Sequence, residues 1–294
     1  MKTLFGKTQD EKKRNIVRII YLTVAIILTL SVALAITLAV TSNSDGGFSS
    51  GSDDTDTVLK YSVTDTHRGT LIVINSKSDA FDFTVNSEKS LSSLNSTSNL
   101  YSVKSEGMKA NKEALSSLSR MLDDFYKQAS DGSTVKKVMI YTAYRSAEDQ
   151  SKLNSKIKAG YSDFHTGMLF ELTVDGTSTS IRNDSTYNWI YENAYKYGFI
   201  ERYPIGKSSY TGVNDFDNAF RYVGAPHAKY MKENGLCLEE YVSLVQNASA
   251  PITADGYKVT YVKANTEGTT EINIPSSTYS VSGDNMGGFI VAYK

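Results

Sequence analysis

The sequence has few residues of the types on which several classes of protein depend. Its 294 residues include one cysteine and three histidines, and the formal net charge is −1. Cys237 cannot form a disulfide within the chain, so a disulfide framework is excluded. The near-zero charge provides no basic surface, which argues against nucleic acid as a partner. Hydrophobic residues make up 40% of the chain, which suffices for one sizeable globular domain with smaller attachments.

One long uncharged run near the N-terminus predicts a membrane anchor. Residues 19–41 carry no charged side chain and are long enough to cross a hydrocarbon core of about 30 Å. Six Lys or Arg residues precede this run and four Asp residues follow it, which places the N-terminus in the cytoplasm. A cleavable signal peptide is the alternative, but its apolar core is only about 7–15 residues long. We therefore expect a type II protein of the cell membrane, single-pass, with an extracytoplasmic C-terminal domain.

The predicted domains follow from this topology and from shifts in composition. Residues 42–57 are rich in Gly, Ser and Asp, which is typical of a flexible linker. Beyond residue 250, four short strand patterns are separated by turn residues, which predicts a small β module. The expected division of the chain is a cytoplasmic tail at 1–18, a transmembrane helix at 19–41, the linker at 42–57, a folded domain at 58–250 and the β module at 251–294.

The central domain mixes helical and strand patterns without regular βαβ alternation, which predicts an α+β fold. Hydrophobic periodicity predicts helices at residues 111–129, 147–158, 186–197 and 238–245 and strands at 70–75, 137–142 and 168–174. Gly198 stands where a helix C-cap is expected. Cys237 and Glu240 have the spacing of a capping box, which gives the cysteine a structural role.

Four segments carry motifs that resemble those of one family. They are YRSAEDQ at 144–150, SDFHTGMLFE at 162–171, ENAYKYGFIERYP at 192–204 and NDFDNAFRYVG at 214–224. These resemble the elements Y-R-S-x-x-x-Q, S-x-H-x-x-G-x-A-x-D, E-N-A-x-x-Y-G-F-x-x-R-Y-P and E-P-W-H-x-R-Y of the VanY-type zinc D,D-carboxypeptidases. The resemblance covers residues 67–245 and implies a D,D-carboxypeptidase-like domain with a central antiparallel sheet and flanking helices.

The same alignment of motifs implies that the metal chemistry of the family is missing. The three zinc-ligand positions of the family are Phe164, Glu171 and Ala219 here, and the general-base position is Phe216. Phenylalanine and alanine offer no lone pair to a metal, and one carboxylate alone does not hold zinc. We therefore expect no zinc or other cofactor and no catalytic residue.

Acidic and imidazole side chains beside these positions could rebuild a metal site. They are Asp163, His165, Asp215 and Asp217. Adjacent side chains of an extended segment point to opposite faces, so His165 is expected to point away from Phe164.

The resemblance implies a surviving substrate-binding edge at Arg145, Ser146 and Gln150. A guanidinium can pair a carboxylate in a bidentate manner, so Arg145 is the main candidate. The alternative is that Arg145 pairs with a nearby acidic side chain. Gln150 is expected to support the loop, and Tyr203 and Arg221 are expected to belong to the scaffold.

Three functions follow from these observations. The first is a catalytically inactive, membrane-anchored relative of the carboxypeptidases, a pseudoenzyme that binds peptidoglycan stem peptides or an envelope partner. The second is an envelope scaffold that makes contacts through its surface or its β module. The third is an active cell-wall D,D-carboxypeptidase with an atypical metal site.

Overall fold

The computed structural model describes residues 49–50, 57–86, 88–129, 135–153, 156–175, 177, 181–214 and 216–294. All of these belong to one compact unit, residues 44–294. No helix within these described ranges is long and apolar enough to cross a membrane. The predicted tail at 1–18, the predicted transmembrane helix at 19–41 and most of the predicted linker lie outside the described residues.

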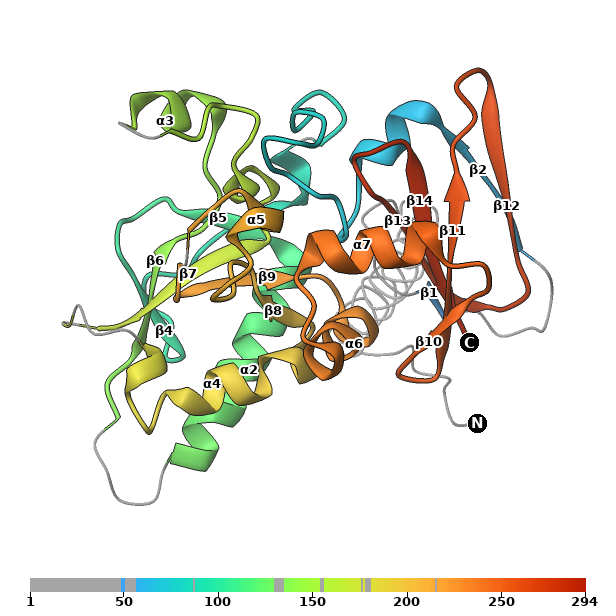
Figure 1. The fold of residues 1–294 in the computed structure, drawn as a ribbon. Helices are drawn as coiled ribbons and strands as arrows, with labels where there is room; N and C mark the ends of the chain where they lie inside the picture. The colour runs from blue at the N-terminus through green and yellow to red at the C-terminus, as the bar shows by residue number, and fades with distance from the viewer. Residues whose placement is uncertain are drawn as a thin grey trace, which may run out of the picture. The chain divides into compact units, whose positions relative to one another are not determined.

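A five-stranded sheet forms the centre of the carboxypeptidase-like domain, in the order β4-β6-β7-β9-β8 (Figure 1). Its strands are β4 (Tyr101–Val103), β6 (Val138–Thr142), β7 (Leu169–Val174), β9 (Ala219–Tyr222) and β8 (Phe199–Glu201). The pair β4–β6 is parallel and the other pairs are antiparallel, so the sheet departs from the expected antiparallel arrangement at β4–β6. The strand β5 (Lys109–Asn111), which pairs with β3 (Leu91–Ser93), and the long helix α2 lie between β4 and β6 in the chain. They provide the crossover connection that a parallel pair needs.

Helices cover one face of this sheet. The predicted helix at 111–129 is confirmed as α2 (Lys112–Ala129), whose buried side chains include Leu118, Leu122 and Phe125. The helix predicted at 186–197 is α4 (Asn188–Asn193) followed by the 3-10 turn η5 (Ala194–Tyr197). Gly198 ends η5 with φ 83°, which confirms its predicted role as C-cap. Both helices share one core with the side chains of Phe170, Leu172 and Phe220.

Shorter helices and turns join these elements. They are η1 (Val63–His67), η2 (Glu88–Ser90), α3 (Ala147–Lys152), η3 (Asp163–Thr166), η4 (Ile181–Asn183), α5 (Ser208–Thr211), α6 (Ala225–Asn234) and α7 (Leu238–Asn247). The helix predicted at 147–158 is therefore shorter, because Leu153 is already extended. The predicted helix at 238–245 is confirmed as α7, with Cys237 at its N-cap and the capping box to Glu240 formed.

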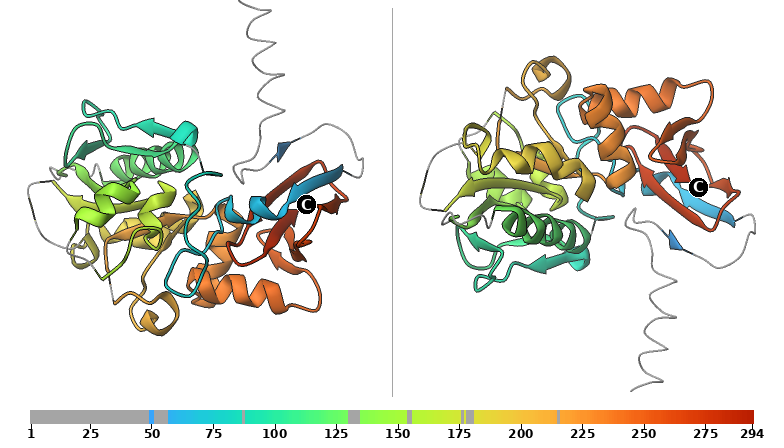
Figure 2. Two further views of the ribbon diagram at one scale, coloured as in Figure 1. Left: turned by 90° about the horizontal axis from the view of Figure 1, so that it is seen from above. Right: turned by 90° about the horizontal axis from the view of Figure 1, so that it is seen from below.

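The C-terminal strands form a β module that also takes in the strand at 57–62. One sheet has the order β1-β13-β14-β11-β10 and β12 pairs with β2. These are β1 (Ser49–Ser50), β2 (Thr57–Ser62), β10 (Ile252–Ala254), β11 (Tyr257–Lys263), β12 (Thr269–Ile274), β13 (Thr278–Gly283) and β14 (Gly288–Tyr293). Figure 2 shows β2 beside the C-terminal strands. The expected division into a domain at 58–250 and a module at 251–294 therefore assigns β2 to a different part of the chain from β12, the strand with which it pairs.

The segment predicted as a strand at 70–75 is buried but belongs to no sheet, so this prediction was wrong. Leu71 and Ile72 have no exposed surface. Backbone N–H groups of this segment donate hydrogen bonds to the β module and not to a neighbouring strand. Leu71 N donates to Ser282 Oγ at 2.9 Å, and Val73 N donates to Asp284 O at 3.1 Å. The segment thus lies between the module and the domain, and Leu71 and Val73 share a core with α6, α7 and β14.

His227 on α6 makes the stability of this shared core dependent on pH. The imidazole is buried and hydrogen-bonded to the Tyr241 hydroxyl at 2.7 Å, and burial lowers the His227 pKa to about 4. Between about pH 6.5, the ordinary pKa of histidine, and about pH 4, this residue is protonated in the unfolded chain and neutral in the folded chain. Lowering the pH through this range therefore favours the unfolded state. We expect the unfolding free energy to fall by about 3 kcal/mol between pH 7 and pH 4 through this residue alone.

Urea unfolding of the natural chain and of His227→Asn across this pH range measures the effect. The asparagine can keep a hydrogen bond to Tyr241 but does not titrate. The variant should therefore have the shallower pH dependence, and equal slopes for the two proteins would contradict the assignment to His227.

Candidate functional site

The first degenerate metal motif folds as a 3-10 turn, η3, at the start of β7. Gly167 ends the turn with φ 67° and its N–H donates to the Phe164 carbonyl at 3.1 Å. A Cβ at Gly167 would lie 2.6 Å from Leu91 Cδ2, so glycine is required both for the backbone angle and for the close approach. The turn fixes the backbone of Phe164 just before β7 begins.

The structure brings the four predicted metal and general-base positions together. Glu171 on β7 and Ala219 on β9 are directly opposite each other in the antiparallel register. Phe164 and Ala219 are buried in one apolar cluster with Leu169 and Tyr203, and Phe216 packs against it. The rings of Tyr203 and Phe216 are stacked, with centroids 6.1 Å apart and an interplanar angle of 16°.

This cluster, which we call the aromatic plug (Phe164, Leu169, Tyr203, Ala219, Val213 and Phe216), lies on the face of the sheet opposite to α2 and α4. Successive side chains of β9 alternate between the two faces, so Phe220 joins the helical core and Ala219 joins the plug. Burial in the plug raises the pKa of Tyr203, which keeps its hydroxyl neutral.

The donor groups left at this place do not fit a zinc ion. Glu171 is the one oxygen donor among the three family positions, and its Oε2 accepts a hydrogen bond from Thr142 Oγ1 at 2.6 Å. Within the described part of the chain, no three His, Cys, Asp or Glu side chains gather as a possible metal site. Phenylalanine and alanine cannot supply the other ligands of a tetrahedral site.

His165 is held away from the plug, although the expected reason was wrong. The segment is a 3-10 turn and not extended. His165 Nε2 accepts from Gly160 N at 3.0 Å, so Nδ1 carries the proton and donates to the Arg145 carbonyl at 2.6 Å. Its ring lies against Phe83, with centroids 4.9 Å apart. Both nitrogens are engaged, and burial lowers the His165 pKa, so this residue is a neutral structural group.

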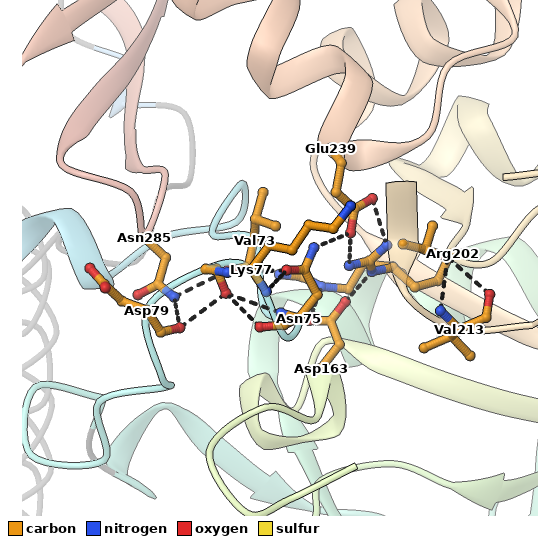
Figure 3. Close-up of polar contacts among 12 residues, drawn as sticks. Val73, Asn75, Lys77, Asp79, Asp163, Arg202, Val213, Glu239 and Asn285 are labelled. Carbon is orange, nitrogen blue, oxygen red and sulfur yellow. Dashed lines mark hydrogen bonds and ion pairs between the residues drawn. The ribbon is translucent and has the colours of Figure 1, made fainter. Parts of the chain in front are cut away.

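Asp163 is committed to a buried ion-pair network (Figure 3). Its two oxygens lie 2.5 Å from Arg202 Nε and 3.1 Å from Arg221 Nε. Arg202 also pairs with Glu239, at 2.7 Å and 3.0 Å, and Asn75 donates to Glu239 at 3.0 Å. Asp163, Arg202 and Arg221 are buried. This network ties η3, β8 and β9 to α7 and confirms that Arg221 belongs to the scaffold.

Two other aspartates were predicted as possible replacement ligands. The Asp217 carboxylate lies 3.9 Å from Arg182 Nε. Asp215 lies outside the described residues.

Arg145 lies over the plug and has no carboxylate partner among the described residues. Its guanidinium carbon is 4.5 Å from the Phe164 ring centroid. Its Nη1 donates to Gln150 Oε1 at 2.9 Å, and no described Asp or Glu oxygen lies within 4.0 Å of it. Burial lowers the Arg145 pKa from its ordinary value, and the charge of Glu171 opposes that shift.

Ser146 and Gln150 both support the loop that carries Arg145. Ser146 Oγ caps α3 by accepting from Asp149 N at 3.0 Å. The buried Gln150 also donates to the Ile157 carbonyl at 2.8 Å. These contacts position Arg145.

A groove borders the aromatic plug. Its volume is about 440 Å³, and Tyr203 and Val213 of the plug form part of its wall. Asn75, Tyr161 and Lys158 are also among the lining residues. The groove lies within the size range of about 300–1,000 Å³ that is usual for sites of small ligands.

Fold and site together define a D,D-carboxypeptidase-like domain in which an aromatic plug includes two of the three predicted metal positions, Phe164 and Ala219. Residues 107–225 match the sequence model of VanY, D-alanyl-D-alanine carboxypeptidase. A D-alanyl-D-alanine carboxypeptidase of Enterococcus faecium is 33% identical over 236 residues, which cover 76% of this chain and 75% of that protein. The chain therefore belongs to the VanY D-alanyl-D-alanine carboxypeptidase family.

Two further comparisons agree with this assignment. A D-alanyl-D-alanine carboxypeptidase of Enterococcus faecalis is 36% identical over 110 residues, which cover 36% of this chain and 40% of that protein. The crystal structure of the vancomycin-resistance D,D-dipeptidase VanXYg with a D-Ala-D-Ala phosphinate analogue has a TM-score of 0.64 and 22% identity, and the match covers 81% of this chain and 98% of that one. The structural likeness shows a shared fold.

Proposed function

We propose that this chain is a non-hydrolysing member of the family that binds peptidoglycan stem peptides. The aromatic plug is the observation that carries the proposal. Phe164 places an apolar ring at a metal-ligand position of the family motifs, and Phe216 places one at the general-base position. The ring of Tyr203 stacks on that of Phe216. The buried ring of Phe164 and the half-buried ring of Phe216 also replace polar groups that would need a metal or hydrogen-bond partners when buried.

Hydrolysis requires two groups that this site does not supply. A metal or another electrophile must activate water, and a base within hydrogen-bond reach must take its proton. Phe216, at the general-base position, has no titratable atom. Glu171, the remaining carboxylate, already accepts the Thr142 hydroxyl proton in a hydrogen bond of 2.6 Å.

Arg145 supports the binding half of the proposal. A guanidinium that is half-buried and has no described carboxylate partner favours an incoming carboxylate, which it can hold with two parallel hydrogen bonds. The C-terminal carboxylate of a stem peptide has this chemistry. The groove beside the plug offers space for the residues that precede it.

We also propose that the domain works outside the cell membrane. The support is the uncharged run at residues 19–41 with positive charges before it and aspartates after it. This placement would bring the domain to the cell wall, where stem peptides occur.

A titration tests the proposed function. A peptide that ends in D-Ala-D-Ala is titrated into the full chain by calorimetry, beside the same peptide with an amidated C-terminus. Because a charge-assisted hydrogen bond contributes about 1.5–3 kcal/mol, we expect Arg145→Gln to weaken binding by about 10- to 100-fold. Amidation of the peptide should have a similar effect on the natural chain.

Arg120→Gln, which removes an exposed arginine on α2, is the matched control and should bind as the natural chain does. Equal affinity of the natural chain and Arg145→Gln would contradict the proposed role of Arg145. Release of free D-alanine from the peptide would contradict the absence of hydrolysis.

A further inference from the structure

A second hollow lies on the opposite face of the sheet, at the surface of α2 and α4. Its volume is about 410 Å³, and its lining includes Phe125, Gln128, Thr186, Asn188, Trp189 and Glu192. It is separate from the aromatic plug, because α2 and α4 pack on the sheet face that carries Phe170 and Phe220.

Trp189 forms the aromatic wall of this hollow. It is the one tryptophan of the chain and is half-buried. Its ring packs on Phe125 and Tyr197, with centroid distances of 6.0 Å and 6.4 Å, so the indole is held in place while one part of it stays accessible. The face of an aromatic ring carries partial negative charge and attracts weakly positive C–H groups.

Polar side chains surround the indole. Asn188 Nδ2 donates to Glu192 Oε1 at 2.9 Å, which orients the carboxylate and leaves Oε2 as an acceptor. The Gln128 amide is exposed, and its side chain makes no hydrogen bond within the described part of the chain. The Thr186 hydroxyl supplies another donor and acceptor.

We propose that this hollow, which we call the Trp189 groove, binds a neutral oligosaccharide. A sugar ring presents C–H groups to an aromatic face and hydroxyl groups at its rim, which match the indole and the amide, hydroxyl and carboxylate groups around it. None of the lining residues is lysine or arginine, and Glu192 carries a negative charge, so the groove disfavours phosphate and carboxylate ligands. Its many polar groups also disfavour a purely apolar ligand.

Trp189 makes the test direct, because the intrinsic tryptophan fluorescence of the full chain reports on this groove alone. Cellotriose, maltotriose and chitotriose are each titrated while the emission is recorded. We expect a saturable change in emission with at least one of the three. Gln128→Ala and Glu192→Gln should each weaken that binding by about fivefold, the size of one lost hydrogen bond.

Ser116→Ala, at another exposed position of α2, is the matched control and should leave the binding curve unchanged. Arg145→Gln should also bind the saccharide normally, so failure of the proposed peptide site and failure of the Trp189 groove give different results. No saturable change with any of the three saccharides, or a change that both groove variants retain in full, would overturn the proposal.

Discussion

Replacing Phe164 and Ala219 by histidine is expected to create a zinc site at the three predicted ligand positions. Glu171 already faces Ala219 across the β7–β9 pair, and Phe164 packs in the same cluster. The double variant therefore presents two imidazoles and one carboxylate at the three family positions, which is a sufficient ligand set for zinc. With zinc at about 100 times its dissociation constant, the folded state should gain about 2.7 kcal/mol. For a domain of this size we expect the melting temperature to rise by about 5–10 °C on adding zinc.

Thermal melts with zinc and with a chelator, together with elemental analysis, measure this effect. A double variant with asparagine at Phe164 and Ala219 is the control, because it places polar side chains of similar size at these positions without imidazole. A zinc-dependent rise in the melting temperature of the natural chain, equal to that of the histidine variant, would contradict our view of the plug. Adding Phe216→Glu to the histidine variant should then allow release of D-alanine from a D-Ala-D-Ala peptide.

Removing the charge of Asp163 is expected to lower the unfolding free energy by about 3–5 kcal/mol. Asp163→Asn keeps the size of the side chain but leaves the buried Arg202 with Glu239 as its one charged partner in the network, and it removes the carboxylate that pairs with the buried Arg221. A buried charge that loses its partner is strongly destabilising. Urea unfolding followed by circular dichroism measures the loss.

Asp123→Asn provides the matched comparison, since Asp123 pairs with Lys127 at 2.6 Å on the exposed side of α2. Exposed pairs contribute about 0–1 kcal/mol, so this variant should be close to the natural chain. If both variants lost the same small amount, the network of Figure 3 would not stabilise the fold as described.

The helices were predictable to the extent that their signals are local. The apolar stripe of α2 and the capping box of α7 depend on neighbouring residues, and both appear in the structure. The helix α6 was missed, although Pro226 at its start and Gly235 at its C-cap are local signals of a helix. The strand expected at 70–75 failed because an apolar run shows burial but does not show which partner satisfies its backbone.

Long-range pairing set the limits of the domain prediction. The strand β2 pairs with β12, more than 200 residues further along the chain. The pattern of Thr57–Ser62 indicates neither this partner nor its register. The parallel pair β4–β6 was missed for the same reason, since β4 is three residues long and carries almost no periodicity.

The candidate site was predictable in its positions and not in its supporting contacts. The motif spacing identified Phe164, Phe216 and Ala219, and the structure brings them together. The hydrogen bond from Thr142 to Glu171 and the pairing of Arg202 with Glu239 join residues that are far apart in sequence.

The most direct test of the central claim is the zinc content of the natural full chain, measured by elemental analysis beside an assay for D-alanine release from a D-Ala-D-Ala peptide. Our account predicts near-zero zinc after purification in zinc-containing buffer and no release above background. About one zinc per chain, with D-alanine release that a chelator abolishes, would contradict it and would mean that Glu171 has recruited ligands from other residues.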